Sequence, residues 1–435
     1  MDITTVLIAL GLLFFFAHIF GALFAKTKIP SVLLLILIGL VVGPVMNWIT
    51  PAFMGNFGSV FTTLTLITIL FESGTSLKLD DLKKSLAGAS ALTLLNFIIA
   101  VGLGIVMGRL LLNLDWLYSL FLGAALGGTS SAVVIPMVNQ LKPGPKTKTV
   151  LYLESALSDV LCLIVALALL GGIETGQVSM VGILTNMGIS MVFAILIGVV
   201  FGMVWTVFLK KVLIGMKNTM FTSFAAAFIL YGLSEKIGLN GGLCILAYGI
   251  TMGNIGHAGF FKKLFNDITE ATLNEEERNF YSEIVFVLQT YFFVFIGISI
   301  KLDNPWHILM GGLFVAGIFL LRPFAAATIG RKDVGPRDKK LIMALGPKGL
   351  VAAVLASLPL QKALAGIGDL RSAETIQNVA YSTVLLSILL CSILVFLVEK
   401  GSKKASEIAN DEGHADVEAG AELKFDEDKQ SEPFV

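Results

Sequence analysis

Two carboxylates lie inside a long apolar run of the sequence. Glu154 and Asp159 both fall within residues 149–170, a stretch that is otherwise long and apolar enough to cross a bilayer. An ionised side chain near the membrane centre costs at least about 2.5 to 3.5 kcal/mol on insertion scales, so such residues usually face a protein interior, an ion path or a charged partner. This run is therefore the first candidate for a functional site.

The spacing of the polar residues in this run gives one helix two faces that carry oxygen atoms. Ser155 and Asp159 are four residues apart and share a face, as do Glu154 and Ser158 on the neighbouring face. Asp159 with Ser155 can offer carboxylate and hydroxyl oxygens to a small hard cation, which prefers oxygen ligands. Glu154 is better suited to pair with a cation that is fixed in the protein.

Two basic residues within apolar stretches could provide that fixed cation. Lys348 lies in the stretch 341–359, and Arg322 lies at the middle of 306–329. An unpaired ammonium there is as costly as an unpaired carboxylate. We therefore predict an ion pair between Glu154 and Lys348, while Arg322 either plays a similar part or extends toward an aqueous cavity. For both basic residues, structural pairing and a direct role in handling ions remain open.

The elements that position these residues are membrane-spanning helices. The chain has 435 residues, of which 56% are apolar and only 14% charged, a composition that excludes a soluble domain. Windows of about 20 residues predict an all-α polytopic membrane protein. The thirteen predicted spans cover residues 3–24, 31–49, 57–77, 87–112, 116–140, 149–170, 178–208, 219–234, 238–255, 281–300, 306–329, 341–359 and 376–398.

The basic residues of the connections predict the orientation of these spans. With the N-terminus outside, most of the 31 lysines and arginines fall on the inner side, as the positive-inside rule requires. The protein is then a multi-pass protein of the plasma membrane with a cytoplasmic C-terminus. The transmembrane domain covers residues 1–400, and the acidic segment 401–435 is predicted to be a disordered cytoplasmic tail because it has almost no apolar periodicity.

Two of the predicted spans contain helix-breaking residues at matching places. Gly127–Ser131, followed by Pro136, interrupts the fifth span, and Gly346–Gly349 interrupts the twelfth. Such a matched pair points to the binding site of a secondary transporter, because unwound backbone offers carbonyls and half-helix ends to an ion. Glycines that merely allow close helix packing are the alternative. We predict two inverted six-helix repeats, 1–170 and 219–398, joined by a linker helix at 178–208.

Glu72 is a further acid within an apolar stretch. It lies a turn or two inside the predicted cytoplasmic end of the span 57–77. It could be an ion ligand or an entrance charge, and its closeness to Lys78 also allows an interfacial ion pair.

Five phrases of the sequence resemble those of the monovalent cation:proton antiporters, in particular the NhaP-like sodium/proton exchangers. The resemblance extends from about residue 10 to residue 398, and its phrases fall in the family's order. They are FESGTSLKLDDL, GGTSSAVVIP, which is similar to an unwound Thr-Asp-Pro crossing, ESALSD, which is similar to Glu-Ser-x-x-Asn-Asp, FFVFIGISI, and GPKGLVAAVLA, which is similar to a Gly-Pro-Arg-Gly crossing.

The resemblance implies a thirteen-span homodimer with a dimerisation domain and a mobile core domain, the latter made of spans four to six and eleven to thirteen. It also implies that Na⁺ or K⁺ and the proton share one site. By motif position, the ligands are Asp159, Ser155, the main-chain oxygen of Thr129, and Glu72, while Ser158 and Ser130 are further candidates. The transported ions and membrane lipid are the expected partners, with no cofactor, no enzyme activity and no nucleic acid.

Three residues depart from the family's pattern. Ser158 replaces the usual Asn, Ser130 replaces the Asp of Thr-Asp-Pro, and Lys348 replaces the Arg of the structural pair with Glu154. A site with a single acid, Asp159, implies electroneutral exchange in which a cation and a proton compete for one carboxylate. The Thr-Ser-Ser crossing is similar to potassium-efflux relatives, so K⁺/H⁺ exchange stays open beside Na⁺/H⁺ exchange.

Three other classes of protein share some of these sequence features. Gly366–Asp369 fits the Gly-x-Gly-Asp pattern of intramembrane aspartyl proteases, but it falls in a predicted outside loop with no second intramembrane Asp to share a proton. A gated cation channel also has charged midplane residues and broken helices. A symporter would need a further cluster of polar residues for an organic solute, and none is evident.

Overall fold

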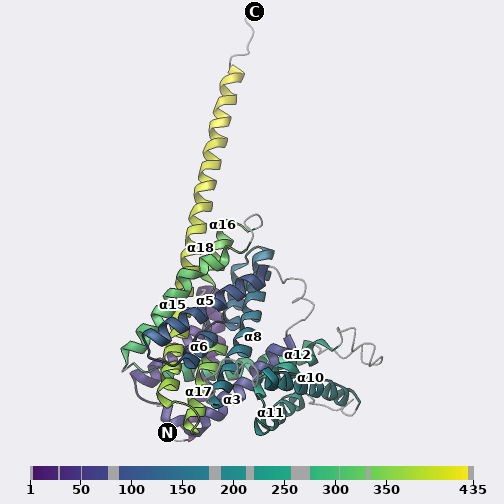
Figure 1. The fold of residues 1–435 in the computed structure, drawn as a ribbon. Helices are drawn as coiled ribbons and strands as arrows, with labels where there is room; N and C mark the ends of the chain where they lie inside the picture. Colours follow the sequence, from purple (N-terminus) through teal and green to yellow (C-terminus); the bar gives the residue numbers. More distant parts are fainter. Residues whose placement is uncertain are drawn as a thin grey trace, which may run out of the picture.

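The structure is a computed structural model of the full chain. It describes residues 3–27, 30–49, 51–76, 88–175, 188–211, 220–255, 275–302, 304–329 and 334–429. Every regular element in these ranges is a helix (Figure 1). In chain order they are α1 (Ile3–Thr27), α2 (Ser31–Leu40), a π-helical turn η1 (Val41–Val45), α3 (Pro51–Ser76), α5 (Gly88–Leu110), α6 (Trp116–Ala125), α7 (Ser131–Leu141), α8 (Pro145–Thr175), α10 (Gly188–Lys211), α11 (Met220–Lys236), α12 (Gly241–Asn254), α14 (Glu275–Ser299), α15 (Pro305–Ala326), α16 (Pro336–Ala344), α17 (Leu350–Leu364) and α18 (Leu370–Lys429).

Each predicted span has a helix or a pair of helices at its place, which confirms the all-α class. Within the described ranges, six helices are by themselves long and apolar enough to cross a membrane, and several others are shorter. The number of crossings stays a prediction, as does the division into repeats. Residues 178–187 of the predicted linker helix lie outside the described ranges.

Both predicted helix interruptions are present. α6 ends at Ala125 and α7 begins at Ser131, while α16 ends at Ala344 and α17 begins at Leu350. Glycines unwind at low cost, and a proline lacks the N–H that a continuing helix would use. Pro136, by contrast, lies inside α7 without ending it. The residues between the half-helices are buried, so unwound backbone lies in the interior of the molecule.

The helices pack into two groups. The core group contains α5–α8 and α15–α18, which correspond to predicted spans four to six and eleven to thirteen. The scaffold group contains α1–α3, α10–α12 and α14. Figure 1 shows α10, α11 and α12 gathered on one side of the molecule, away from α5 and α15. The unwound segments both belong to the core group, and α3, α12 and α14 contact it from the scaffold side.

Glycines allow backbone contact inside the scaffold group. A Cβ atom added to Gly39 of α2 would collide with the carbonyl of Val294, and one added to Gly297 of α14 would collide with the carbonyl of Ile36. Small residues commonly join membrane helices. Lipid tails are as apolar as the helix surfaces, so no hydrophobic force drives the helices together, and close approach provides van der Waals contact instead. The contact between α2 and α14 therefore depends on these two glycines.

We expect Gly297→Ala to destabilise the protein by about 1 to 3 kcal/mol, because the helices must separate to admit the methyl group. The measurement is the melting temperature of the detergent-purified protein. Gly102→Ala is the matched control, since a Cβ at Gly102 of α5 meets nothing within 4 Å. Equal melting temperatures for the two variants would contradict the packing argument.

The acidic tail differs from its prediction. Residues 401–429 continue α18 as a helix, which projects beyond the rest of the molecule (Figure 1). The physical reason is that Ala, Glu and Lys are good helix formers and that an existing helix extends without a new nucleation step. The prediction of disorder was wrong for this stretch, and residues 430–435 lie outside the described ranges.

Candidate cation-binding site

Asp159 lies on α8 beside the unwound segment between α6 and α7. Its side chain is nearly buried, with 5% of the residue exposed. The hydroxyl of Ser131 donates a hydrogen bond of 2.8 Å to its Oδ2 atom. Ser131 is the first residue of α7, so the carboxylate faces a helix N-terminus, where the partial positive charge of the backbone favours an anion. Both features favour a negative charge or a hydrogen-bond acceptor at this position.

A cavity of about 360 Å³ leads to Asp159. Its walls come from α2, α3 and α14 of the scaffold group and from α7, α8 and α17 of the core group, so it lies between the two groups. Glu72 stands on the opposite wall and accepts a hydrogen bond of 3.0 Å from the hydroxyl of Ser76. The polar residues that line the cavity are Ser31, Glu72, Ser73, Ser130, Ser131, Asp159, Ser282, Gln289 and Thr290.

Two predicted hydroxyl ligands of α8 do not line this cavity. The Ser155 hydroxyl donates to the carbonyl of Tyr152 on its own helix, at 3.0 Å. The Ser158 hydroxyl donates to the carbonyl of Ser155 at 3.1 Å and accepts from the main-chain N–H of Thr129 at 2.9 Å. Ser158 therefore holds the unwound segment against α8, while the Ser155 hydroxyl stays bonded within α8. The structure brings together Asp159 and Glu72 and leaves Ser155, Ser158 and Thr129 behind the cavity wall.

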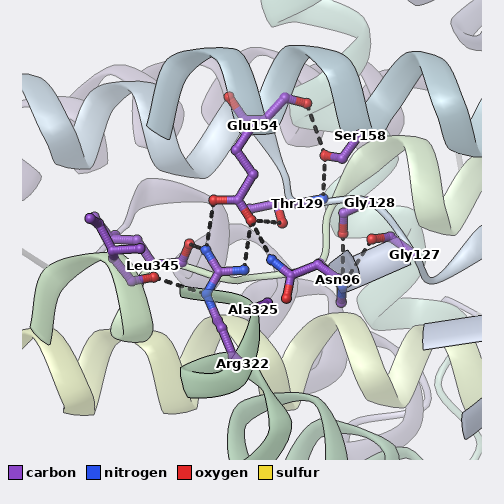
Figure 2. Close-up of polar contacts among 12 residues, drawn as sticks. Asn96, Gly127, Gly128, Thr129, Glu154, Ser158, Arg322, Ala325 and Leu345 are labelled. Atoms are coloured by element: carbon purple, nitrogen blue, oxygen red, sulfur yellow. Dashed lines mark hydrogen bonds and ion pairs between the residues drawn. The ribbon is translucent and has the colours of Figure 1, made fainter. Parts of the chain in front are cut away.

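Glu154 forms a buried ion pair, but with Arg322 and not with Lys348. Two nitrogens of the guanidinium donate to the two carboxylate oxygens, at 2.7 and 2.8 Å (Figure 2). Asn96 of α5 donates to Oε1 at 2.8 Å, and the Thr129 hydroxyl lies 3.4 Å from the same oxygen. The predicted pair of Glu154 with Lys348 was therefore wrong, and Arg322 takes the structural role.

The physical reason for this exchange of partners is that each basic residue serves the end of a different half-helix. Arg322 also donates to the carbonyls of Ile342 and Leu345, at 2.9 and 2.7 Å, where α16 ends. The ammonium of Lys348 donates to the carbonyl of Gly128 at 3.0 Å, in the unwound segment that follows α6. Positive charge is favourable at helix C-termini, and only a guanidinium has enough donors to bind two carbonyls and both oxygens of a carboxylate together, since an ammonium has three donors.

The two unwound segments bind each other directly. The main-chain N–H of Ser130 donates to the carbonyl of Pro347 at 2.8 Å. A Cβ at Gly349 would collide with the hydroxyl of Ser130, so the crossing requires glycine there. The main-chain N–H of Lys348 is bonded to the hydroxyl of Ser387 on α18, at 2.9 Å. The segments thus cross at a fixed point next to Asp159.

The sequence reasoning missed two residues of this region. Asn96 is a polar residue within an otherwise apolar predicted span, which is a usable signal for a buried hydrogen-bond partner. Ser131 was part of the quoted crossing, but the pattern alone does not show that its hydroxyl faces Asp159 whereas that of its neighbour Ser130 faces Gly349.

Ion pairs join the core group and the scaffold group at the end of the molecule away from the cavity. Lys362 of α17 is 2.8 Å from the Glu174 carboxylate of α8 and 3.4 Å from the Glu235 carboxylate of α11. Glu174 and Lys362 belong to the core group, and Glu235 belongs to the scaffold group. The interface between the groups is therefore open at the cavity and bridged at this opposite end.

A family model described as sodium/hydrogen exchanger, transmembrane, matches residues 12–400. The chain belongs to the sodium/hydrogen exchanger family. This exchanger is 24% identical over 369 residues to Na(+)/H(+) antiporter 1 of Methanocaldococcus jannaschii, with 80% of this chain and 81% of the relative covered. It is 25% identical over 340 residues to the K(+)/H(+) antiporter NhaP2 of Shewanella sp. strain MR-4, covering 75% of this chain but only 55% of that longer relative.

A solved structure has the same fold as this exchanger. The sodium proton antiporter MjNhaP1 from Methanocaldococcus jannaschii, determined at pH 8, matches with a TM-score of 0.72 at 21% identity, covering 90% of this chain and all of that one. Together with the family match, this confirms the NhaP-like antiporter fold that the five sequence phrases predict. The family match identifies the chain as a multi-pass membrane transporter.

The protease-like pattern has a structural explanation. Asp369 directly precedes α18, is exposed, and accepts a hydrogen bond of 2.8 Å from the main-chain N–H of Ser372. The hydrogen bonds from Ser372 lower the pKa of the Asp369 carboxyl from its usual range. Asp369 is thus an ionised cap of the helix start.

Proposed function

We propose that this exchanger trades one monovalent cation for one proton, with Asp159 holding the two ions in turn. The observation that carries the proposal is the position of Asp159 on the wall of a cavity, beside the crossing of two unwound segments. Na⁺ is our first choice of cation and K⁺ the alternative. The chain itself acts as a transporter and not as an enzyme.

The distribution of charge supports a single exchanging acid. The charge of Glu154 is neutralised by Arg322, and the ammonium of Lys348 is engaged by a main-chain carbonyl. In the described part of the chain, no basic group lies within 4 Å of Asp159. Lys348 acts on Asp159 only from a longer distance, so a cation or a proton bound directly to the carboxylate compensates its charge, and either one makes the other unnecessary. Moving the empty site with its uncompensated carboxylate through the apolar membrane interior is costly. This cost limits movement of one ion without exchange for the other.

The two ends of the interface support a mechanism of alternating access. The cavity is walled by the parts of α2, α3 and α14 that the positive-inside rule predicts to lie toward the cytoplasm, which supports an inward-facing state. Lys362 bridges the opposite end. Movement of the core group against the scaffold group would open that end and close the cavity.

We propose that the scaffold group also forms the contact of a homodimer in the plasma membrane.

Two observations keep K⁺ as the alternative cation. Ser130 stands where the family's crossing has a carboxylate, so this crossing adds no second charge to a cation site. Some of the relatives are K(+)/H(+) antiporters, although this chain spans only about half of their length. Glu72, on the opposite wall of the cavity, would attract either cation on its way to Asp159.

A transport assay tests the proposed stoichiometry. Purified protein in vesicles that contain a pH-sensitive dye should move protons against Na⁺, K⁺ or Li⁺ offered in turn. Because one cation is exchanged for one proton, no net charge crosses the membrane. The rate should therefore be unchanged when a membrane potential of either sign is imposed. Potential-dependent exchange would contradict the one-acid site, and proton-independent cation flux would indicate a channel.

A further inference from the structure

The hydroxyl of Ser131 is the side-chain oxygen in direct hydrogen-bond contact with the exchanging carboxylate. It lies 2.8 Å from Oδ2 of Asp159, and both residues line the cavity. Ser131 is only partly buried, whereas Ser155 is fully buried. A cation that enters the cavity and reaches Asp159 therefore meets the Ser131 oxygen at the same time.

Three other hydroxyls near Asp159 are hydrogen-bonded elsewhere. Those of Ser155 and Ser158 donate to carbonyls of α8, and that of Thr129 points to Glu154. The Ser130 hydroxyl is against Gly349, where a Cβ atom would collide with it. Ser131 is thus the one residue of this set whose hydroxyl bonds only to Asp159 among the described contacts.

We propose that Ser131 is a cation ligand and the residue of this chain that sets cation selectivity. A hydroxyl carries one donor hydrogen and two acceptor lone pairs, and it rotates freely. In the empty site the hydrogen points to Asp159 and stabilises the carboxylate. When a cation binds, the hydroxyl turns its lone pair to the ion, and the carboxylate exchanges a hydrogen bond for an ion contact. A bound proton on Asp159 can likewise be donated to the same oxygen.

The position of Ser131 makes the ligand pair rigid. Ser131 is the first residue of α7, and the preceding Ser130 is fixed by its main-chain bond to Pro347. Asp159 lies in the middle of the long helix α8. The separation between the two ligand oxygens is therefore set by backbone that belongs to one group of helices, and a rigid spacing discriminates between cations of different size.

The test compares Ser131→Ala with Ser131→Thr, which keeps the hydroxyl, in reconstituted full-length protein. This proposal depends on the proposed function, so wild-type exchange is measured first. We expect Ser131→Ala to raise the KM for Na⁺ about tenfold, the loss typical of one hydrogen bond to a charged group, and to change the Na⁺/K⁺ preference. Ser131→Thr should restore the KM to within about twofold. Ser155→Ala should raise the KM less than Ser131→Ala does.

Ser392→Ala is the matched control, since it removes a hydroxyl that is bonded to Ile388 of its own helix. A merely structural role of Ser131 would lower the maximal rate equally for all cations, with KM and preference unchanged, and that result would overturn the proposal. If the alanine variant is not recovered folded, Ser131→Cys takes its place, because a soft thiol is a poor ligand for these hard cations. Absence of exchange in the wild type would instead contradict the proposed function itself.

Discussion

Asp159→Asn should abolish cation-driven proton movement in reconstituted vesicles. Asparagine has nearly the same shape as the carboxylate and can still accept the hydrogen bond from Ser131, so the fold should be retained. The amide neither takes up a proton near neutral pH nor carries the charge that attracts a cation. Because both half-reactions need the same carboxylate, exchange should fall to the level of protein-free vesicles for every cation tested.

Asp115→Asn is a suitable control for this variant. Asp115 immediately precedes α6, its side chain is 87% exposed, and asparagine serves equally well at a helix start. Its exchange rate should equal that of the wild type. Normal exchange in the Asp159 variant would refute the competition mechanism, while Glu72 would become the next candidate for the exchanging acid.

Arg322→Met should strongly destabilise the protein. Removal of the guanidinium leaves the buried carboxylate of Glu154 without its counter-charge and the end of α16 without two hydrogen bonds. Breaking one side of a buried ion pair typically costs about 3 to 5 kcal/mol. The expected result is a low folded yield and a clearly lower melting temperature in detergent, whereas Arg371→Met at an exposed position should stay near the wild-type value.

A double variant separates the charge effect from the loss of packing. Glu154→Gln combined with Arg322→Met removes both charges, and Asn96 can still donate to the remaining side-chain oxygen. The double variant should therefore melt at a higher temperature than Arg322→Met alone. An Arg322 variant with a wild-type melting temperature but no exchange would show that the guanidinium acts in transport and not in folding.

The sequence was sufficient to predict the helices and the place of Asp159. Membrane helices are long apolar runs, and a charged residue inside such a run has few possible reasons to be there, so both signals are strong. The two unwound segments were also predictable, because Gly127, Gly128 and Pro347 combine low helix propensity with matching positions in the two halves.

The partners of the buried charges were not predictable from the sequence. Two basic residues, Arg322 and Lys348, were both plausible partners of Glu154. Which of them pairs with it depends on the backbone carbonyls that each one binds near the two helix interruptions. The roles of the serines were equally hidden. Helical spacing shows which face Ser155 occupies, but a serine hydroxyl can bond to its own helix instead of pointing to a ligand, as it does here.

The tail shows a different limit of sequence reasoning. Residues 401–429 have no apolar stripe that could pack on a neighbour, which favoured disorder. Their helical state follows from continuity with α18, a property of the preceding segment and not of the tail's own pattern.

The bonds of Arg322 have a mechanical consequence for the exchanger. This one guanidinium, carried by α15, is fastened to α8 through Glu154 and to the end of α16, and the same carboxylate holds α5 through Asn96. Four helical segments are thus pinned at a single buried point. The closest glycine contacts, such as that of Gly39 with α14, occur within a group and not across the interface between the groups in the described ranges. In the proposed mechanism, the cation site therefore moves as one rigid unit with the core group, so its geometry stays the same while the core group slides against the scaffold group.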